Sequence, residues 1–495
     1  IGVSGGSERA TFSSSLGYLK QDGTMDHTYF ERLSGRLNSR FNFDKLTIGE
    51  SVSFARSEQV AQQGGNQNEQ NTMTQILLMN SIIPVYDIEG NFAGGKAGGF
   101  TNGKNPVAFA YNNRNDIDVE YRVLGNMFAE YQLLQPLKFR SSYSVDFKNR
   151  FQPRANFPRF EDREVNSSNN YEETHQNNFN WVWTNTLEFG KTFADRHTLK
   201  VLAGHEAVKN NFREIQAQVN NLAFMDVPVR FLNLTYSTFN SLTSEERIVT
   251  LASVFGKIDY EFNDKYLASF TVRRDGSSDF LEDNRFGVFP AASLGWRISE
   301  ESFMDGVGLV DDLKLRAGWG ITGNQNIPVA YNAYNQYGGR NAYDASYDIT
   351  GSNGAMQTGY TLFRYGNPGT QWEENESVNF GLDASILNGK FNVVFDVYRR
   401  DITGLIFNPI LPGSAGNSNQ PYRNVASMRN NGWDLGINYR GNLNEIGVNL
   451  SLNATRYVNE ITKLDGEQNF IFPPGIDKRF GEVNVWQVGF PISSF

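Results

Sequence analysis

The sequence predicts an all-β protein, a transmembrane antiparallel β-barrel, and three observations lead to this fold class. Apolar and polar side chains alternate in about fifteen segments of roughly ten residues, as in barrel strands between lipid and water. No segment approaches the run of about 18 apolar residues that a membrane-spanning helix needs. Aromatic residues make up 14% of the 495 residues, which is typical of barrels with aromatic girdles at both interfaces.

The alternation is clearest between Leu137 and Phe147. The odd positions of this segment carry mostly apolar side chains and the even positions carry charged or small ones, so an extended strand here has one apolar and one polar face. A similar alternation runs from Ile446 to Thr455. The pattern predicts strands, in chain order, at residues 10–18, 32–42, 45–55, 119–131, 137–148, 179–190, 197–208, 250–262, 264–274, 288–298, 313–320, 376–387, 390–399, 432–442 and 445–457.

The connections between these strands alternate between short and long. Short turns are predicted at Phe43-Asp44, Gln135-Pro136, Asn263-Asp264, Asn388-Gly389 and Leu443-Asn444, and long connections at residues 57–118, 149–178, 209–249, 321–375 and 400–431. Outer-membrane barrels have short periplasmic turns and long extracellular loops, so the long connections are expected outside the cell. A soluble β-sandwich or propeller also alternates apolar and polar residues, but a propeller spaces its turns more evenly.

The charge and the residue types limit the chemistry of the chain. The net charge of −9 argues against a nucleic-acid partner, because binding phosphate groups needs a basic face. Cysteine is absent, so the chain has no disulfide and no thiolate metal site. The sequence shows no matched pair of catalytic carboxylates and no zinc-binding histidine spacing. We therefore expect no catalytic residues, no metal centre and no bound cofactor.

One acidic segment qualifies that expectation. Asp275, Asp279, Glu282 and Asp283 lie close together in a segment that we expect to be an outer loop. Neighbouring carboxylates can bind calcium through their oxygen atoms, although the spacing is not that of an EF-hand. The alternative interpretation is a solvated acidic loop without a bound ion.

The long connection at 321–375 contains the candidate ligand-binding residues. Tyrosine offers a flat apolar ring with a hydroxyl group, and asparagine adds hydrogen bonds, so the mixture suits a neutral polar ligand such as an oligosaccharide or a peptide. In the alternative interpretation, these aromatic rings pack the loop against itself or a partner. The candidates are Tyr331, Tyr334, Asn335, Tyr337, Tyr343, Tyr360 and Trp372.

Several segments resemble the SusC/RagA type of TonB-dependent outer-membrane transporter. The strongest is RRDGSSDFLEDNRFGVFPAASLGWRISEESFM at 273–304, followed by LKLRAGWGITGNQNI at 313–327. The segments at 4–23, 372–406, 430–439 and 488–495 are also similar to that family. The resemblance implies active import of an oligosaccharide or oligopeptide across the outer membrane of a Gram-negative bacterium. It also implies a SusD-like surface lipoprotein and the TonB-ExbB-ExbD energising complex as partners, with outer-membrane lipid around the barrel.

The family also carries a plug domain and a TonB-binding segment ahead of the first barrel strand, and its barrel has about 22 strands. We therefore expect residues 1–495 to be one incomplete barrel domain with about 15–16 strands, with the plug before residue 1 and the last strands after residue 495. Two alternatives remain open. One is a passive porin that closes at sixteen strands, and the other is a surface β-protein that degrades glycans.

Overall fold

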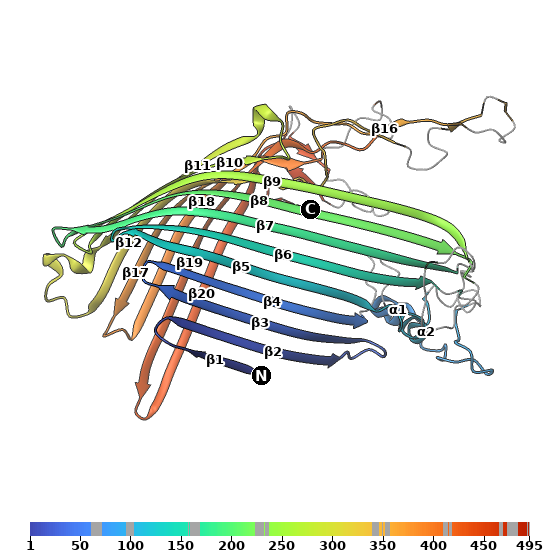
Figure 1. The fold of residues 1–495 in the computed structure, drawn as a ribbon, viewed down its shortest axis with the longest axis horizontal. Coiled ribbons are helices and arrows are strands. Elements are labelled where there is room, and N and C mark those ends of the chain that lie inside the picture. Colours follow the sequence, from blue (N-terminus) through green and yellow to red (C-terminus); the bar gives the residue numbers. More distant parts are fainter. Residues whose placement is uncertain are drawn as a thin grey trace. The chain divides into compact units, whose positions relative to one another are not determined.

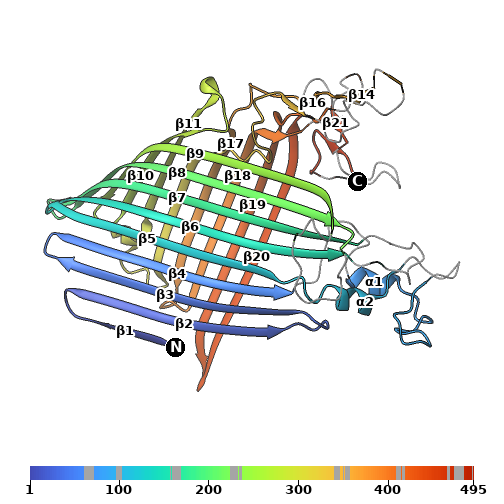
Figure 2. The same ribbon diagram turned by 45° about the vertical axis from the view of Figure 1, so that its right-hand side comes forward.

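The structure is a computed structural model. It describes residues 1–60, 72–95, 103–156, 158, 169–222, 232, 237–338, 346–348, 350–351, 357–408, 414, 418–464, 469–472, 484–492 and 494. Within these residues, sixteen strands form one antiparallel sheet. Their order in the sheet is their order along the chain, so each strand is hydrogen-bonded to the strands before and after it. Figure 1 and Figure 2 both show β2 to β6 side by side in chain order.

The strands of this sheet confirm the predicted all-β fold. The first nine are β1 (Gly2–Gly6), β2 (Ala10–Asp22), β3 (Tyr29–Phe43), β4 (Leu46–Val60), β5 (Asp118–Leu134), β6 (Leu137–Asn156), β7 (Asn170–Phe193), β8 (His197–Asn220) and β9 (Thr238–Phe262). The next seven are β10 (Tyr266–Ser277), β11 (Phe286–Arg297), β12 (Val310–Asn324), β17 (Glu373–Ile386), β18 (Phe391–Phe407), β19 (Arg423–Leu443) and β20 (Ile446–Lys463).

The remaining elements are short. Three further pairs of strands are β13 (Gln336–Gly338) with β16 (Thr361–Arg364), β14 (Ser346–Tyr347) with β15 (Gln357–Thr358), and β21 (Phe470–Ile471) with β22 (Trp486–Gln487). The helices are α1 (Thr72–Leu78), α2 (Pro106–Asn112), η1 (Glu282–Asn284), η2 (Ile298–Glu300) and η3 (Ser302–Met304). None of the helices in the described part of the chain has the length and apolar character needed to span a membrane.

All fifteen predicted strands are present, and several are longer than predicted. The strand predicted at 179–190 begins already at Asn170, and the one predicted at 197–208 continues to Asn220. The extension of β7 carries polar residues on both faces, so the alternation that identifies a strand fades there although the backbone stays extended. In β8 the alternation is interrupted by polar residues at 209–211 and resumes from Glu214. The sequence analysis missed β1, whose five residues are mostly glycine and serine and carry no alternation.

The predicted short turns are confirmed, and their backbone shows why they suit these residues. Asp44, Asn263, Asn388 and Asn444 all have positive φ values, between 44° and 58°. Two-residue hairpin turns need this backbone region because it matches the right-handed twist of the flanking strands, and aspartate, asparagine and glycine tolerate it best. Gly389 completes the Asn388-Gly389 turn with φ 73°.

The chain divides into two compact units. The first comprises residues 1–131, 140–183 and 208–248, and the second comprises residues 132–139, 184–207 and 249–495. A small buried cluster of Ala155, Tyr171 and Val219 lies in the first unit. The second has a buried cluster of Ala426, Ile461 and Leu464. Neither cluster is a large core, as expected for a sheet with lipid on one face and water on the other.

The register of β18 and β19 shows the two faces directly. On one face, Phe391 pairs with Tyr439, Val393 with Ile437, Phe395 with Leu435 and Val397 with Trp433. On the other face, Asn392 pairs with Asn438 and Asp396 with Asp434. In an outer-membrane barrel the apolar face contacts lipid and the polar face lines the lumen.

Candidate functional site

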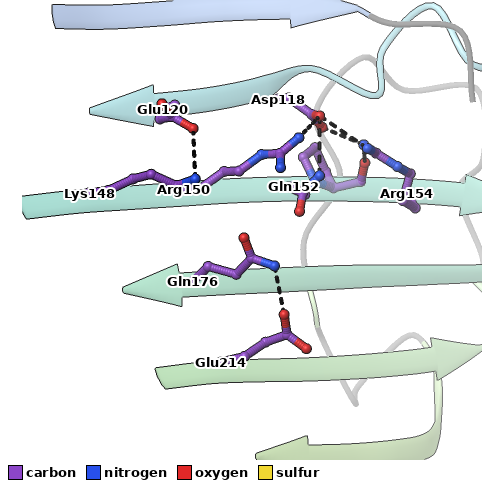
Figure 3. Close-up of polar contacts among 9 residues, drawn as sticks. Asp118, Glu120, Lys148, Arg150, Gln152, Arg154, Gln176 and Glu214 are labelled. Carbon is purple, nitrogen blue, oxygen red and sulfur yellow. Dashed lines mark hydrogen bonds and ion pairs between the residues drawn. The ribbon is translucent and has the colours of Figure 1, made fainter. Parts of the chain in front are cut away.

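The first unit carries a polar wall next to its long connections. Even-numbered residues of β5, β6, β7 and β8 share one face of the sheet, and near the long connections most of this face is charged or amide-bearing, with Thr174 and Phe212 as exceptions. Figure 3 shows the residues, which we call the outer polar wall: Asp118, Glu120, Lys148, Arg150, Gln152, Arg154, Gln176 and Glu214.

Asp118 is the centre of this wall. Its side chain is only 5% exposed, and it accepts hydrogen bonds from both Nη atoms of Arg154, at 2.6 and 3.1 Å. Arg150 donates to Asp118 Oδ2 at 3.0 Å and the Gln152 amide donates to the same atom at 3.2 Å (Figure 3). Two guanidinium groups and an amide thus compensate one buried carboxylate, as a charge removed from water requires.

The rest of the wall is paired in the same manner. Lys148 Nζ lies 3.6 Å from Glu120 Oε2, and the Gln176 amide donates to Glu214 Oε2 at 2.6 Å (Figure 3). The wall contains three carboxylates and three cationic groups, so it carries no net charge. It can therefore offer donors and acceptors to a polar ligand without selecting strongly for one sign of charge.

The structure places four of the predicted ligand-binding tyrosines at the surface. Tyr331, Tyr334, Tyr337 and Tyr360 are between 59% and 84% exposed. Asn335 instead stabilises the loop, because its Oδ1 accepts a hydrogen bond from the backbone N–H of Gly366 at 2.8 Å. Tyr343 lies outside the described residues.

Trp372 differs from these tyrosines. Its ring centroid lies 5.3 Å from the rings of both Phe280 and Phe289, and its indole N–H donates to the carbonyl oxygen of Arg285 at 3.1 Å. The indole is thus fixed between two aromatic rings by a hydrogen bond to the backbone. The structure does not group Trp372 with the exposed tyrosines.

The acidic segment shows no arrangement suited to a cation. Asp275 is paired with Arg273, whose Nε lies 2.6 Å from Asp275 Oδ1, and Glu282 and Asp283 lie in the short helix η1. Over the part of the chain that the structure describes, no group of three or more His, Cys, Asp or Glu residues could hold a metal ion. The calcium interpretation therefore gains no support from the geometry.

The sequence analysis did not identify the outer polar wall. Lys148, Arg150 and Arg154 continue the polar parity of β6, and this continuation beyond the apolar segment is the signal that could have found them. Asp118 sits one residue before the strand predicted at 119–131, so it counted as part of a long connection. Its role depends on cross-strand pairing with residues more than thirty positions away.

Comparison with known proteins supports this architecture. A family model described as "TonB dependent receptor-like, beta-barrel" matches residues 85–490. TonB-dependent receptor P26 of Formosa agariphila is 29% identical over 442 residues, which cover 88% of this chain and 43% of that protein. TonB-dependent receptor SusC of Bacteroides thetaiotaomicron is 27% identical over 535 residues, which cover 100% of this chain and 50% of that protein.

Solved structures agree with these relatives. The structure of the RagAB peptide transporter matches with a TM-score of 0.82 and 25% identity, over 99% of this chain and 53% of that chain. The ferripyoverdine receptor of Pseudomonas aeruginosa, at 11% identity and a TM-score of 0.54, covers 93% of this chain and 54% of that one, and shares the fold alone. The chain spans about half the length of the curated relatives it matches.

The relatives confirm two expectations from the sequence. The resemblance to SusC/RagA-type proteins is confirmed by the SusC and RagAB matches, and the relatives are receptors and transporters rather than enzymes. The family match covers well over half of the chain. The chain therefore belongs to the TonB-dependent receptor-like β-barrel family of the outer membrane.

Proposed function

We propose that this chain is part of the barrel of a transporter that imports an oligosaccharide or an oligopeptide in a TonB-dependent manner. The observation that carries the proposal is the outer polar wall, which continues the polar face of β5 to β8 where the long connections begin. A wall of paired charges and amides binds a neutral or zwitterionic polar molecule through many hydrogen bonds. Such a ligand is too large and too polar to cross the bilayer unaided.

The exposed tyrosines extend this binding surface in the proposal. Tyr331, Tyr334, Tyr337 and Tyr360 present rings that can stack on sugar rings or on peptide side chains, and their hydroxyl groups can form hydrogen bonds. Loop tyrosines bind polar ligands at a low entropic cost because they rotate about only two side-chain bonds.

The partners follow from the same proposal. A SusD-like surface lipoprotein would help to capture the ligand, and the TonB-ExbB-ExbD complex would supply energy through a plug domain. The relatives are about twice as long as this chain, which supports the idea that residues 1–495 form one incomplete barrel domain, with about 15–16 strands of a barrel of about 22. A plug is needed because a barrel of that width encloses a large lumen.

The test uses the full-length gene in its bacterium. We would delete the gene and measure uptake of fluorescent oligopeptides and, separately, of fluorescent oligosaccharides, with and without a protonophore. We expect the deletion to abolish energy-dependent uptake of one ligand class, and the full-length gene to restore it. Unchanged uptake of both classes would overturn the proposal. If the full-length gene restored uptake that the protonophore does not reduce, the protein would be a passive channel.

A further inference from the structure

The apolar face of β17 to β20 ends in a change from apolar to charged side chains. Paired residues across these four strands form rows. One row consists of Leu382, Phe395, Leu435 and Ala454. The next consists of Phe380, Val397, Trp433 and Arg456, and the one after it of Val378, Arg399, Asn431 and Val458. The apolar band therefore gives way to arginines within two rows.

A groove of about 830 Å³ lies at this boundary, within the second unit. That volume lies in the range of pockets that hold small molecules. Two arginines, Arg399 and Arg456, and two carboxylates, Glu376 and Asp401, stand along its polar side. Its apolar lining comes from Val378, Phe380, Val397, Trp433 and Val458.

The hydrogen bonds in the groove leave cationic groups available. Asp401 accepts a hydrogen bond from Arg399 Nε and another from Arg429 Nε, each at 2.6 Å, so one carboxylate faces two guanidinium groups. No other hydrogen bond of the Arg399 guanidinium is present within the described residues. Glu376, on the other side of the groove, accepts a hydrogen bond from the Trp319 indole at 2.8 Å.

Arg456 is the clearest available cation. Its side chain is exposed, and no ion pair is formed by it in the described part of the chain. It lies directly across from Trp433, at the edge of the apolar band. Arginine and tryptophan are common at this depth, where a side chain can contact both acyl chains and headgroups.

The strand direction places the groove on the outer side of the membrane. β18 begins just after the short Asn388-Gly389 turn and runs toward the long connection that follows Phe407. Short turns are periplasmic and long loops extracellular in outer-membrane barrels, so Arg399 lies toward the outer leaflet. Figure 2 shows β17 to β20 as neighbouring strands of one sheet.

We propose that this groove binds a phosphorylated lipid of the outer leaflet. An acyl chain would lie along the apolar lining, and the phosphate would contact Arg399 and Arg456. Guanidinium groups match phosphate oxygens in geometry and charge, and the bond is stronger at a membrane surface than in bulk water. Arg399 and Arg456 stand two strands and one row apart, about 12 Å between their backbones, so both flexible side chains can reach one headgroup.

Native mass spectrometry of the full-length protein in detergent tests this proposal, with lipid A and dephosphorylated lipid A as the two probes. We expect the protein to retain the phosphorylated form preferentially. Arg456→Gln and Arg399→Gln should each weaken its retention roughly tenfold. Arg400→Gln is the matched control, because Arg400 adjoins Arg399 but takes the opposite face of β18, and it should bind as the unmodified protein does.

Three outcomes would overturn the proposal. They are equal retention of the dephosphorylated lipid, full retention by Arg456→Gln, and loss of retention by Arg400→Gln. Full retention by Arg456→Gln together with a changed oligomeric state would make the groove an interface with another copy of the chain. Folding is checked by heat-modifiable migration, and Arg456→Gln decides the question by itself if Arg399→Gln does not fold.

Discussion

Asp118, at the start of β5, forms a two-point ion pair with Arg154, near the end of β6, although the two residues are 36 positions apart in the chain. Arg154 Nη1 also donates to the carbonyl oxygen of Pro153 at 2.7 Å, which orients the guanidinium group. The pair therefore joins the two strands at the end where the long connections begin. The outer polar wall depends on this link for its shape.

The first prediction concerns that pair. Asp118→Asn removes the charge that compensates Arg150 and Arg154, so we expect a loss of about 1–3 kcal/mol in local stability. Hydrogen exchange of the full-length protein in detergent should become faster at the facing ends of β5 and β6. Glu120→Gln is the control, because its ion pair with Lys148 is longer and more exposed, and it should cost less than about 1 kcal/mol. Equal effects of the two changes would contradict the central role of Asp118.

The second prediction concerns the exposed tyrosines. Replacing Tyr334 and Tyr337 together with alanine should raise the ligand concentration for half-maximal uptake several-fold, because each ring is worth about 0.5–1.5 kcal/mol in stacking. Both side chains are exposed, so the amount of folded barrel should not change. Tyr18→Ala, at an equally exposed tyrosine on β2, is the control. Unchanged uptake by the double variant would end the assignment of these residues to ligand binding.

The third prediction separates Trp372 from that group. Trp372→Ala removes a ring that packs on Phe280 and Phe289, so it should lower the free energy of unfolding by about 3 kcal/mol. Trp372→Phe keeps the ring packing but loses the hydrogen bond to Arg285, and about 1 kcal/mol should be lost. Denaturant unfolding in detergent measures both. If Trp372→Ala reduced uptake at full stability, Trp372 would belong with the ligand-binding residues instead.

The fourth prediction is a pH effect at a short connection. The Tyr266 hydroxyl donates to Glu301 at 2.6 Å and the Trp296 indole donates at 3.1 Å, and with Lys265 nearby they hold the pKa of Glu301 below its ordinary value. Because the pKa of Glu301 is lower in the folded protein, its carboxylate stabilises the folded state at pH values above the unfolded-state pKa of about 4.3. This stabilisation is lost as the pH falls through the folded-state pKa.

Unfolding in detergent at neutral pH and at about pH 3 tests this. Glu301→Gln should be less stable than the unmodified protein at neutral pH, and the difference should vanish at low pH. Glu300→Gln is the control, since Glu300 pairs with Arg297 and takes no hydrogen bond from Tyr266 or Trp296. If the difference in stability between Glu301→Gln and the unmodified protein stayed constant with pH, the lowered pKa of Glu301 would not contribute to stability and the prediction would be wrong.

The sequence by itself determined fifteen of the sixteen strands of the main sheet, the short turns and the two faces. Side chains of a strand alternate between faces whatever the strand packs against, so the segment from Leu137 to Phe147 indicates an apolar and a polar face from composition alone. Turns such as Asn388-Gly389 are equally local, because positive φ values favour these residue types. These properties are set within a few neighbouring residues, so the amino-acid sequence is enough to predict them.

Only the tertiary structure decided which side chains meet. The contact between Asp118 and Arg154 depends on the register of β5 against β6, and the lipid-facing groove depends on the registers of β17 to β20 together. The tertiary structure also separates Trp372 from the exposed tyrosines, because the Trp372 ring packs on Phe289. Shifting a strand by one residue would move every side chain to the other face, and the pattern within one strand does not fix its partner's register.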